Sequence, residues 1–529
     1  MQPVVTAEEM RALDRATIDV IGLPAMTLME TAGRGVAEAA LRMLSHGRAD
    51  GGARRQRGRD GDHVAVVCGP GNNGGDGFVC ARVLRDRGVD AVVYLAVPRE
   101  RIAGDAKSHF DIYEAAGGVV LAIDTPAGLD EQRVTMERAA IAIDALFGIG
   151  PVRPIEGHLA NVVAAINAAR QRLAVDVPSG LDSDTGRASG ACVEATRTVT
   201  MGAAKIALVG APGFAHAGVV EVCDIGVPAV VMATANVRAG LIEERDVRGW
   251  LPEIRPLDHK GTRGHVVVVG GAHEMRGAGR LAANAALRAG AGLVTLAGDG
   301  EVDADDSIMT RAIDGSGAST TGTDASAALV QLDSLLVGKQ AVVIGPGLGQ
   351  RDPAEARVRE VLALGIPAVL DADALNVLAR DPSVIAKAAG PIVITPHPGE
   401  AARLLGIATG EIEADRLSAA RTLAKKTSAV VVLKGARTIV CDGTLGDDFC
   451  AINPTGSPAL ATGGAGDVLA GAIAALIAQG CAPAEAACAA VFIHGRAGEA
   501  LFATHGRGAV SSDLPLAFAF ASKQIQSGA

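Results

Sequence analysis

The chain has 529 residues, of which 49% are hydrophobic, 20% charged and 2% aromatic, and its formal net charge at pH 7 is −10. This length predicts two or three domains whose cores are packed mainly by aliphatic side chains. The net negative charge argues against a broad surface that binds nucleic acid or an anionic membrane. A site for an anionic ligand therefore requires a local cluster of positively charged groups.

The eight cysteines are scattered and form no Cys-x-x-Cys pair, which favours free thiols over a disulfide framework or a structural zinc site. Glu8 and Glu9 stand where a signal peptide would be apolar, and the apolar runs are shorter than the roughly 20 residues that a membrane helix needs. We therefore expect a soluble, cytoplasmic protein that binds neither nucleic acid nor membrane, and we expect it to form a homo-oligomer.

In the first half, two helical patterns precede a regular alternation of strands and helices. A capping box at Thr6 and Glu9 predicts a helix over residues 7–20, and a second helix follows over residues 25–44. The basic run at residues 50–62 is expected to be a surface loop, because no apolar or aromatic pattern accompanies it. Strands are expected at residues 64–68, 91–95, 119–123, 140–144, 173–176 and 219–223. The alternation predicts a doubly wound parallel sheet that binds its ligand at the carboxyl ends of the strands.

Three polar or glycine-rich loops follow strands at that edge, at residues 72–76, 144–154 and 176–182. Taken singly, each loop is an ordinary turn signal, but three together favour a binding site. The glycine spacing does not match Gly-x-Gly-x-x-Gly, so a standard dinucleotide fingerprint is not supported.

The first half carries the motif Asn72-Asn73-Gly74-Gly75-Asp76-Gly77, followed by Asp144 and by Asp176-Val177-Pro178-Ser179-Gly180. On these motifs, residues 1–230 resemble the YjeF N-terminal domain of the NAD(P)H-hydrate epimerase family. The resemblance implies a Rossmann-like fold and a hydrated nicotinamide dinucleotide as ligand. It implies that the ligand is held by Asn72, Asn73, Gly74, Gly75, Asp76, Gly148, Ile149, Gly150, Pro151, Val152, Arg153, Pro154 and Asp176. It also implies a K⁺ ion held by Asn73, Asp144 and Ser179, whose oxygen donors suit a hard cation.

Residues 231–256 are expected to be a linker, because charged residues and prolines interrupt the apolar pattern there. The alternation then restarts in an α/β domain over residues 257–525. Its strands are expected at residues 265–269, 293–296, 341–344, 368–370, 392–395 and 430–433, and nearly all end at polar or glycine-rich segments.

The segment Thr462-Gly463-Gly464-Ala465-Gly466-Asp467 precedes an apolar helix expected at residues 468–478. Its glycines let backbone amides turn inward, and the helix N-terminus adds unpaired amides and a positive dipole end. Together they form a seat for a phosphate, with Asp467 placed to take a proton from a hydroxyl that attacks phosphorus. The alternative is a glycine-rich turn in which Asp467 is an ordinary N-cap.

This signature resembles the ribokinase-like superfamily. Five further motifs accompany it, and they are Lys260-Gly261, Gly345-Pro346-Gly347, Asp371-Ala372-Asp373, Thr395-Pro396-His397-Pro398-Gly399-Glu400 and Lys434-Gly435. Together with these motifs, the signature is similar to the ADP- or ATP-dependent NAD(P)H-hydrate dehydratase family. The resemblance implies substrate contacts from Ala278, Gly347, His397 and Asp467. It implies nucleotide contacts from Lys434, Gly435, Ala436, Arg437, Thr438 and Gly466, with ADP or ATP as co-substrate and Mg²⁺ as cofactor. Asp371 and Asp373 either organise Mg²⁺ through water or cap a helix, and the sequence leaves both open.

Together, the two resemblances imply a bifunctional enzyme with two three-layer α/β domains. Its substrates would be hydrated NADH and NADPH: one half would interconvert the R and S epimers, and the other would dehydrate the S epimer, with ADP expected to yield AMP and phosphate. Two alternatives stay open. The C-terminal half is compatible with a small-molecule kinase, and the N-terminal half with a nucleotide-binding module that has no catalytic activity.

Overall fold

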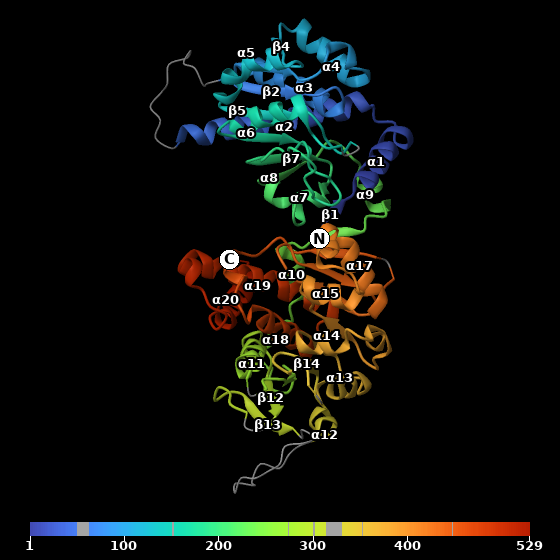
Figure 1. Ribbon diagram of the computed structural model, residues 1–529, viewed down its shortest axis with the longest axis vertical. Coiled ribbons are helices and arrows are strands. Elements are labelled where there is room, and N and C mark those ends of the chain that lie inside the picture. The colour runs from blue at the N-terminus through green and yellow to red at the C-terminus, as the bar shows by residue number, and fades with distance from the viewer. Residues whose placement is uncertain are drawn as a thin grey trace. The chain divides into compact units, whose positions relative to one another are not determined.

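A computed structural model describes residues 1–49, 63–150, 153–272, 274–299, 302–313, 331–351, 353–446 and 448–528 (Figure 1). The chain divides into two compact units, which are Pro3–Val237 and Arg238–Ala529 together with Met1–Gln2. The basic run at residues 50–62 lies outside the described residues. Within the described residues, no helix has the length and apolar character that crossing a bilayer requires.

The sheet of the N-terminal unit has the strand order β4-β3-β2-β5-β6-β7-β9, and every pairing in it is parallel. Its strands are β2 (Val64–Cys68), β3 (Ala91–Leu95), β4 (Val120–Ala122), β5 (Ile141–Ala145), β6 (Arg172–Val175), β7 (Arg197–Met201) and β9 (Val219–Cys223). A further short parallel pair joins β1 (Gln2–Val5) to β8 (Ala204–Lys205). The parallel, doubly wound sheet predicted from the alternating pattern is confirmed.

Helices cover both faces of this sheet, because alternate strand residues point to opposite sides. Val64 and Val66 pack against α2, α3 and α4, whereas Ala65 and Val67 pack against α5 and α6. The helices of the unit are α1 (Ala7–Arg15), α2 (Ala25–Ala49), α3 (Asn72–Asp86), α4 (Gly104–Ala115), α5 (Pro126–Glu137), α6 (Gly157–Ala168), α7 (Ile206–Val209), α8 (Phe214–Ala217) and α9 (Ala229–Thr234), with a π-helical turn at Ala16–Val20 after α1.

Helix α3 begins at Asn72, whereas the sequence predicted a loop over residues 72–76. The glycines of this segment are needed for packing. A Cβ on Gly74 would lie 2.1 Å from the carbonyl oxygen of Gly69, and a Cβ on Gly75 would lie 2.5 Å from the sulfur of Met29. The glycines therefore let the start of α3 approach its neighbours closely instead of forming a loop.

The sheet of the C-terminal unit has the order β13-β12-β11-β14-β15-β16-β17-β18-β19-β10. The pairings are parallel except that β18 runs antiparallel to both of its neighbours. The strands are β10 (Ala239–Leu241), β11 (His265–Val269), β12 (Leu293–Asp299), β13 (Met309–Ile313), β14 (Ala341–Ile344), β15 (Ala368–Leu370), β16 (Ile392–Ile394), β17 (Val430–Leu433), β18 (Ile439–Asp442) and β19 (Cys450–Ile452).

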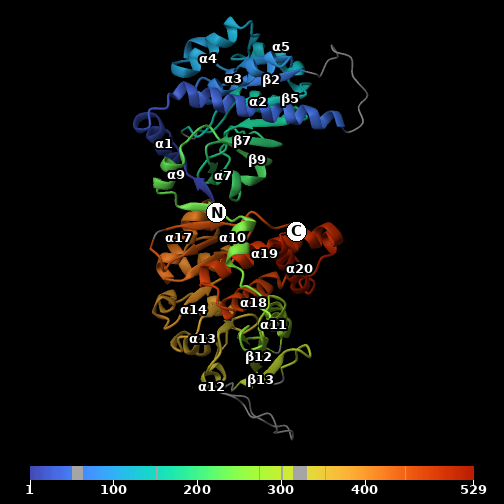
Figure 2. The ribbon, with the colours of Figure 1, turned by 180° about the vertical axis from the view of Figure 1, so that it is seen from behind.

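Two groups of helices enclose this sheet and complete a three-layer unit, as expected from the sequence (Figure 2). One side carries α11 (Arg276–Arg288), α18 (Ala465–Ala478), α19 (Pro483–His505) and α20 (Leu514–Ser527). The other side carries α13 (Ala354–Ala363), α14 (Asp373–Leu378), α15 (Pro398–Leu405) and α17 (Arg416–Thr427), and the unit also contains α10 (Glu244–Trp250), α12 (Leu332–Leu336) and α16 (Thr409–Ala414). Helix α18 is buried along nearly its whole length, which explains its uninterrupted apolar sequence.

Two expectations need correction. Residues 231–256 were expected to be a linker, but β10 pairs with β19 and α10 packs against α19, so most of this segment belongs to the C-terminal unit. Strand β10 has the sequence Ala239-Gly240-Leu241, which contains a glycine and lacks the β-branched residues that mark a strand, so no pattern indicated it.

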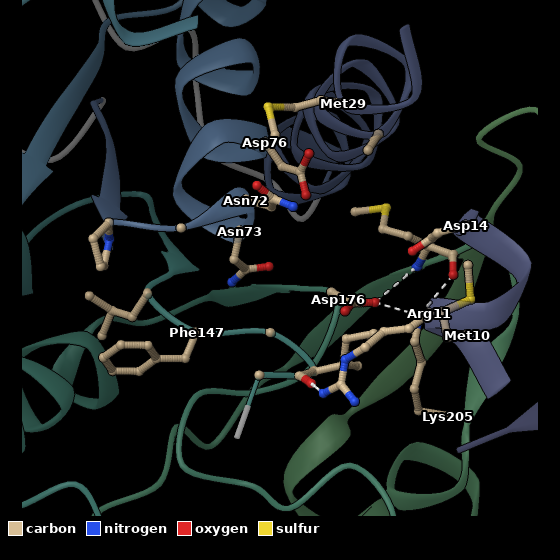
Figure 3. Close-up of a pocket in the computed structure, with 18 of the residues that line it drawn as sticks. Met10, Arg11, Asp14, Met29, Asn72, Asn73, Asp76, Phe147, Asp176 and Lys205 are labelled. Carbon is tan, nitrogen blue, oxygen red and sulfur yellow. Dashed lines mark hydrogen bonds and ion pairs between the residues drawn. The ribbon is translucent and has the colours of Figure 1, made fainter. Parts of the chain in front are cut away.

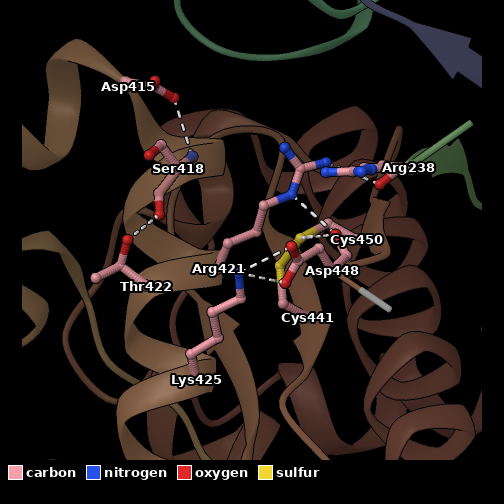
Figure 4. Close-up of a disulfide and its surroundings, with 9 residues drawn as sticks. All are labelled: Arg238, Asp415, Ser418, Arg421, Thr422, Lys425, Cys441, Asp448 and Cys450. Atoms are coloured by element: carbon pink, nitrogen blue, oxygen red, sulfur yellow. Dashed lines mark hydrogen bonds and ion pairs between the residues drawn. A yellow bond between two sulfur atoms is a disulfide. The ribbon is translucent and has the colours of Figure 1, made fainter. Parts of the chain in front are cut away.

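The cysteines were expected to be free thiols, yet Cys441 and Cys450 form a disulfide (Figure 4). They are directly opposite each other on the antiparallel strands β18 and β19, with their Cα atoms 4.4 Å apart. Beside them, Asp448 accepts hydrogen bonds from Arg421 and Lys425. The pair escaped prediction because neither of these strands was recognised from the sequence.

Candidate active sites

A cavity of about 850 Å³ lies at the carboxyl ends of the strands in the N-terminal unit (Figure 3). The predicted residues that line it are Asn72, Asn73, Asp76, Gly148, Ile149, Gly150, Arg153, Pro154 and Asp176. Pro151 and Val152 lie outside the described residues. Gly74 and Gly75 are buried within α3 and serve its packing, so the structure does not place them at the cavity wall.

Asp176 directly follows β6 and has a left-handed backbone conformation, with φ of 64°. Its Oδ1 atom accepts hydrogen bonds from Lys205 Nζ at 2.6 Å, Thr200 Oγ1 at 3.1 Å and Met201 N at 3.2 Å. Its Oδ2 atom faces Gly148, where a Cβ would lie 3.2 Å away. One oxygen is therefore anchored by three donors, and the other points toward a glycine of the cavity wall.

Lys205 was not identified from the sequence, although it is the more unusual residue of this pair. Its side chain is 0% exposed, and its ammonium group also donates to Thr200 Oγ1 at 3.0 Å and to the Met201 carbonyl at 2.7 Å. A fully buried lysine requires a charged partner, and here Asp176 provides it. The available signal was a single charged residue inside the apolar run at residues 203–209.

Three further carboxyl groups line the same cavity, Asp14 from α1, Asp76 from α3 and Asp105 from α4. Burial raises the pKa of Asp76 well above its usual range, and the charge of Asp176 raises it further, whereas Lys205 lowers it. Burial also raises the pKa of Asp14. The cavity thus holds a carboxyl group that favours its protonated form close to one that is anchored by an ammonium group.

The three residues predicted to hold a cation lie at the same edge of the sheet. Asp144 is fully buried and accepts hydrogen bonds from the backbone of Ser179 at 2.8 Å and from its hydroxyl at 2.7 Å. Burial raises the pKa of Asp144 to about 6 even though these hydrogen bonds lower it. Asn73 Oδ1 lies 3.2 Å from the position of a Cβ on Gly148, and its buried Nδ2 has no hydrogen-bond partner among the described residues. These groups offer amide, carboxylate and hydroxyl oxygens.

In the C-terminal unit, the predicted phosphate seat lies at the start of α18. Gly464 is the N-cap and has a left-handed conformation, with φ of 92°. Within the described residues, the amides of Gly464, Gly466 and Asp467 donate to no backbone carbonyl outside the helix. Asp467 stands in the first helical turn and is half-buried. Burial, followed by the charge of Asp371, raises the pKa of Asp467 to about 7, while Lys434 lowers it.

Lys434 lies beside this turn, at the end of β17. Its Nζ atom is 2.6 Å from Asp371 Oδ1 and 3.9 Å from Glu400 Oε2, and a Cβ on Gly466 would lie 3.1 Å from it. Burial alone would lower the pKa of Lys434, but the carboxylates of Asp371 and Glu400 raise it above its usual value. The ammonium group therefore stays charged next to the unpaired amides of α18.

His397 is the N-cap of α15. Its Nδ1 atom accepts hydrogen bonds from the amides of Gly399 at 3.0 Å and Glu400 at 3.3 Å. Burial, together with Lys434 and Arg403, lowers the pKa of His397, so the ring is neutral at pH 7. Because Nδ1 is an acceptor, the proton is on Nε2, which makes the exposed edge of the ring a hydrogen-bond donor.

The remaining predicted residues fall into two groups. Gly347 and Ala278 are neighbours, because a Cβ on Gly347 would lie 3.3 Å from Ala278 Cβ. Gly435, Ala436, Arg437 and Thr438 form the turn between β17 and β18, in which Thr438 Oγ1 donates to the Gly435 carbonyl at 2.9 Å. Arg437 has a φ of 56°, and its guanidinium donates to the Pro454 carbonyl.

Two further residues support this region; Arg416 was not identified from the sequence, and His494 was expected to be a packed or half-exposed residue. Arg416 is buried, and its Nη2 atom donates to the carbonyl of Lys434 at 3.1 Å. It thereby fixes the turn that follows. His494 on α19 is buried near the backbone of Ala465, and burial lowers its pKa to about 4. In both cases the partner lies far away in sequence, which no local pattern reveals.

The structure separates the roles of Asp371 and Asp373. Asp373 accepts hydrogen bonds from the amide of Gly349 at 2.9 Å and from Gln350 Nε2 at 3.0 Å, so it fixes the loop after β14. Asp371 accepts from Thr395 Oγ1 at 2.8 Å and pairs with Lys434, beside α18. Neither residue is the N-cap of α14, which is Ala372.

Comparison with known proteins gives matches in both halves. Residues 25–207 match the family model described as YjeF-related protein N-terminus, and residues 266–517 match the model described as NAD(P)H-hydrate dehydratase. The bifunctional NAD(P)H-hydrate repair enzyme Nnr of Moorella thermoacetica is 41% identical over 522 residues, which are 97% of this chain and 95% of the relative. Its namesake from Escherichia coli (strain K12) is 34% identical over 513 residues, covering 96% of this chain and 92% of the relative.

A solved structure is also similar to the C-terminal part. The ADP/ATP-dependent NAD(P)H-hydrate dehydratase from Bacillus subtilis, co-crystallized with ATP/Mg²⁺, has a TM-score of 0.44 and 29% sequence identity. The match covers 54% of this chain and 98% of that structure.

Proposed function

The chain belongs to the family of bifunctional NAD(P)H-hydrate repair enzymes, and from this premise we propose which residues carry each of its two reactions. It repairs NADH and NADPH that have gained water across the C5–C6 double bond of the nicotinamide ring. The N-terminal half interconverts the R and S epimers at C6, and the C-terminal half dehydrates the S epimer with consumption of an adenine nucleotide. The bifunctional enzyme expected from the sequence is confirmed.

For dehydration, we propose that the C6 hydroxyl is first phosphorylated, because hydroxide is a poor leaving group. Asp467 takes the hydroxyl proton while the oxygen attacks the terminal phosphorus of the nucleotide, and the bond from that phosphorus to its bridging oxygen breaks with its electron pair on the departing nucleotide, which is AMP when ADP is used. The phosphate then leaves C6 with the electron pair of the C6–O bond, C5 loses a proton to the departing phosphate, and the C5–C6 double bond is restored. The observation that supports this order of events is the position of Asp467. It is a half-buried carboxyl group with a pKa near 7, in the turn whose amides and neighbouring Lys434 suit a phosphate.

We propose that the nucleotide phosphates lie between Lys434 and the first turn of α18, with Gly466 as the point of closest approach. Gly435, Ala436, Arg437 and Thr438 would contact the rest of the nucleotide, which we expect to be ADP. Ala278, Gly347 and His397 would contact the hydrated nicotinamide dinucleotide.

Mg²⁺ in such sites is held mainly by phosphates and water, with one or two carboxylates. Asp371 fits this role, because its Oδ2 atom faces Gly466, whereas both oxygens of Asp373 are engaged by Gly349 and Gln350. Bound there, the ion supplies positive charge at the phosphates.

For epimerisation, we propose that the substrate occupies the cavity of the N-terminal unit and that Asn73, Asp144 and Ser179 hold K⁺ beside it. The donor set supports this assignment, because it combines oxygens that suit a hard cation with a buried carboxylate whose pKa is raised by burial. Bound there, K⁺ supplies positive charge at the edge of the cavity. A cytoplasmic location and a homo-oligomeric state stay predictions from the sequence.

The test is to incubate the protein with hydrated NADH and either ADP or ATP, and to follow the return of reduced-nicotinamide absorbance together with release of inorganic phosphate. Repair predicts that both appear in equal amounts. A small-molecule kinase would instead accumulate a stable phosphorylated product with no return of absorbance, and that outcome would contradict the proposal.

A further inference from the structure

Epimerisation at C6 places a stereochemical demand on the cavity of the N-terminal unit. Inverting this carbon requires that a group leave from one face of the ring and that a group return from the other. A catalyst therefore needs a proton donor and a proton acceptor that approach the ring from different sides. This requirement rests on the proposed function, and it can be compared with the side chains that line the cavity.

Asp76 and Asp176 are two of the carboxyl groups lining the cavity, and both meet this requirement. Asp76 projects from near the start of α3, and Asp176 projects from the end of β6, so they face the cavity from two different elements. Figure 3 shows Asp76 in the upper part of the view and Asp176 below it, with Lys205 reaching toward Asp176 from below. Both residues are largely buried, which keeps bulk water away from any proton that they exchange with a ligand.

From this geometry we propose that Asp76 and Asp176 are the catalytic acid and base of the epimerisation, and that Lys205 is a positioning residue that holds Asp176 for the reaction. The assignment deepens the proposed function, because it names the groups that move the protons. It also gives a role to the buried lysine, which touches Asp176 and Thr200.

The chemistry balances without an oxidant or a reductant. Asp76 donates its proton to the C6 hydroxyl, the C6–O bond breaks with its electron pair on oxygen, and the lone pair of N1 forms an N1=C6 double bond as water leaves. Water then adds to the opposite face of C6, the N1=C6 electron pair returns to nitrogen, and Asp176 accepts the proton that the water releases. The reverse epimerisation uses the same groups with their roles exchanged.

The environments of the two groups suit these roles. Asp76 favours the protonated form, because burial and the neighbouring Asp176 both raise its pKa. On Asp176, the three donors converge on Oδ1 and leave Oδ2 on the side of Gly148. Two carboxyl groups whose surroundings differ in this way are a recurrent arrangement for paired acid and base catalysis.

The position of Lys205 explains why Asp176 can hold a strained backbone conformation. Its ammonium group bridges Asp176 to Thr200 and to the carbonyl of Met201, so it ties the end of β6 to the end of β7. The Lys205 side chain is fully buried, so a small displacement of Asp176 or Lys205 would leave a buried charge without its partner. Removing the ammonium group is therefore expected to change the rate of reaction more than the affinity for the substrate.

The test is an epimerisation assay on the full-length protein. The R epimer of hydrated NADH is supplied without any adenine nucleotide, so that the dehydratase half cannot consume it, and formation of the S epimer is followed by chromatography. Asp76→Asn, Asp176→Asn and Lys205→Met are each expected to lower kcat by about 100-fold or more, with KM changed less than about threefold. Lys107→Met and Asp111→Asn remove an exposed lysine–aspartate pair on α4 and are expected to leave both constants unchanged.

A double variant separates positioning from general structural support. If Lys205 acts through Asp176, then Asp176→Asn with Lys205→Met is no slower than Asp176→Asn alone. A double variant that is slower by the product of the two single effects would overturn the positioning role. Since Lys205→Met risks unfolding the unit, its thermal unfolding is compared with that of Asp176→Asn, which keeps the size of the side chain and tests the base by itself.

The outcomes distinguish a failure of the proposed epimerase function from a failure of the acid and base assignment. A wild-type protein that converts R to S no faster than the spontaneous rate would contradict the proposed function of the N-terminal half. An active wild-type protein whose Asp76→Asn or Asp176→Asn variant keeps its kcat would leave that function standing and would refute the acid and base assigned here.

Discussion

Replacing Asp467 by asparagine is the perturbation that most sharply separates the two halves of the enzyme. The change keeps the size of the side chain and its place in the first turn of α18, but it removes the group that takes the hydroxyl proton. Loss of a positioned general base typically costs about 10²–10⁴-fold in rate. We expect kcat for nucleotide-dependent dehydration to fall by that factor, which corresponds to about 3–5 kcal/mol in the activation barrier.

The assay uses the S epimer of hydrated NADH with ADP or ATP and records the return of reduced-nicotinamide absorbance. Epimerisation of the R form, measured without nucleotide, is expected to stay at the wild-type rate. Asp381→Asn, which changes a surface carboxylate of the same unit, is the matched control and is expected to leave both reactions unaffected. The reasoning would be refuted if Asp467→Asn kept more than a tenth of the dehydration rate, or if it abolished both reactions.

The raised pKa of Asp467 leads to two further predictions, one for the pH dependence of activity and one for the pH dependence of stability. A base with a pKa near 7 predicts that kcat/KM for dehydration falls as the pH drops below neutrality. Because this pKa is higher in the folded protein than the ordinary value of 3.8, the folded state binds the proton more tightly than the unfolded chain does. The resulting contribution to stability is complete at pH values below about 4 and is lost as the pH rises through about 7. We therefore expect Asp467→Asn to gain thermal stability relative to the wild type as the pH is raised, which would show that lost activity is not lost structure.

Three other predictions follow from contacts in the two units. Lys434→Met is expected to raise the KM for the nucleotide at least tenfold in the dehydration assay, because it removes the ammonium group beside α18; an unchanged KM would place the phosphates elsewhere. Exchanging K⁺ for an organic cation too large for the Asn73 site is expected to slow epimerisation at least tenfold and to leave dehydration unchanged, and equal slowing of both would contradict the assignment. Gly74→Ala is expected to destabilise the N-terminal unit by about 1–3 kcal/mol in urea unfolding, because its Cβ would lie 2.1 Å from the Gly69 carbonyl oxygen, and an unchanged midpoint would contradict this.

The strands that could be predicted are those built from short runs of aliphatic residues buried on both faces, such as β2 and β17. The strands that escaped prediction lack this pattern. In β7, the buried Thr198 and Thr200 alternate with other residues and are satisfied by hydrogen bonds to Ala217 and Asp176. Only tertiary contacts can stabilise such polar positions, so no local rule identifies them.

The candidate sites also differ in whether their residues are recognisable from local sequence. The placement of Asp467 at a glycine-rich helix start was predictable, because the glycines, the helix start and the carboxylate are consecutive in sequence. The pairing of Lys205 was not, because its partner Asp176 lies 29 positions away and meets it only when β6, β7 and β8 are assembled. Gly74 and Gly75 were expected to contact the ligand, but the folded chain uses them for close packing of α3. A glycine motif indicates that another group lies close to the backbone, but only the structure shows whether that group belongs to a ligand or to the protein.

The fate of the oxygen atom at C6 tests the central claim most directly. Hydrated NADH can be prepared in ¹⁸O-labelled water, so that its C6 hydroxyl carries the label. It is then dehydrated by the Asp176→Asn variant, in which the N-terminal half is not expected to exchange that hydroxyl with water, and the products are analysed by mass spectrometry. If the hydroxyl is phosphorylated before it leaves, each inorganic phosphate that is released carries one ¹⁸O atom. If the label appears only in water, the hydroxyl left without ever being joined to phosphorus, and the role given to Asp467 and the turn around it would be wrong.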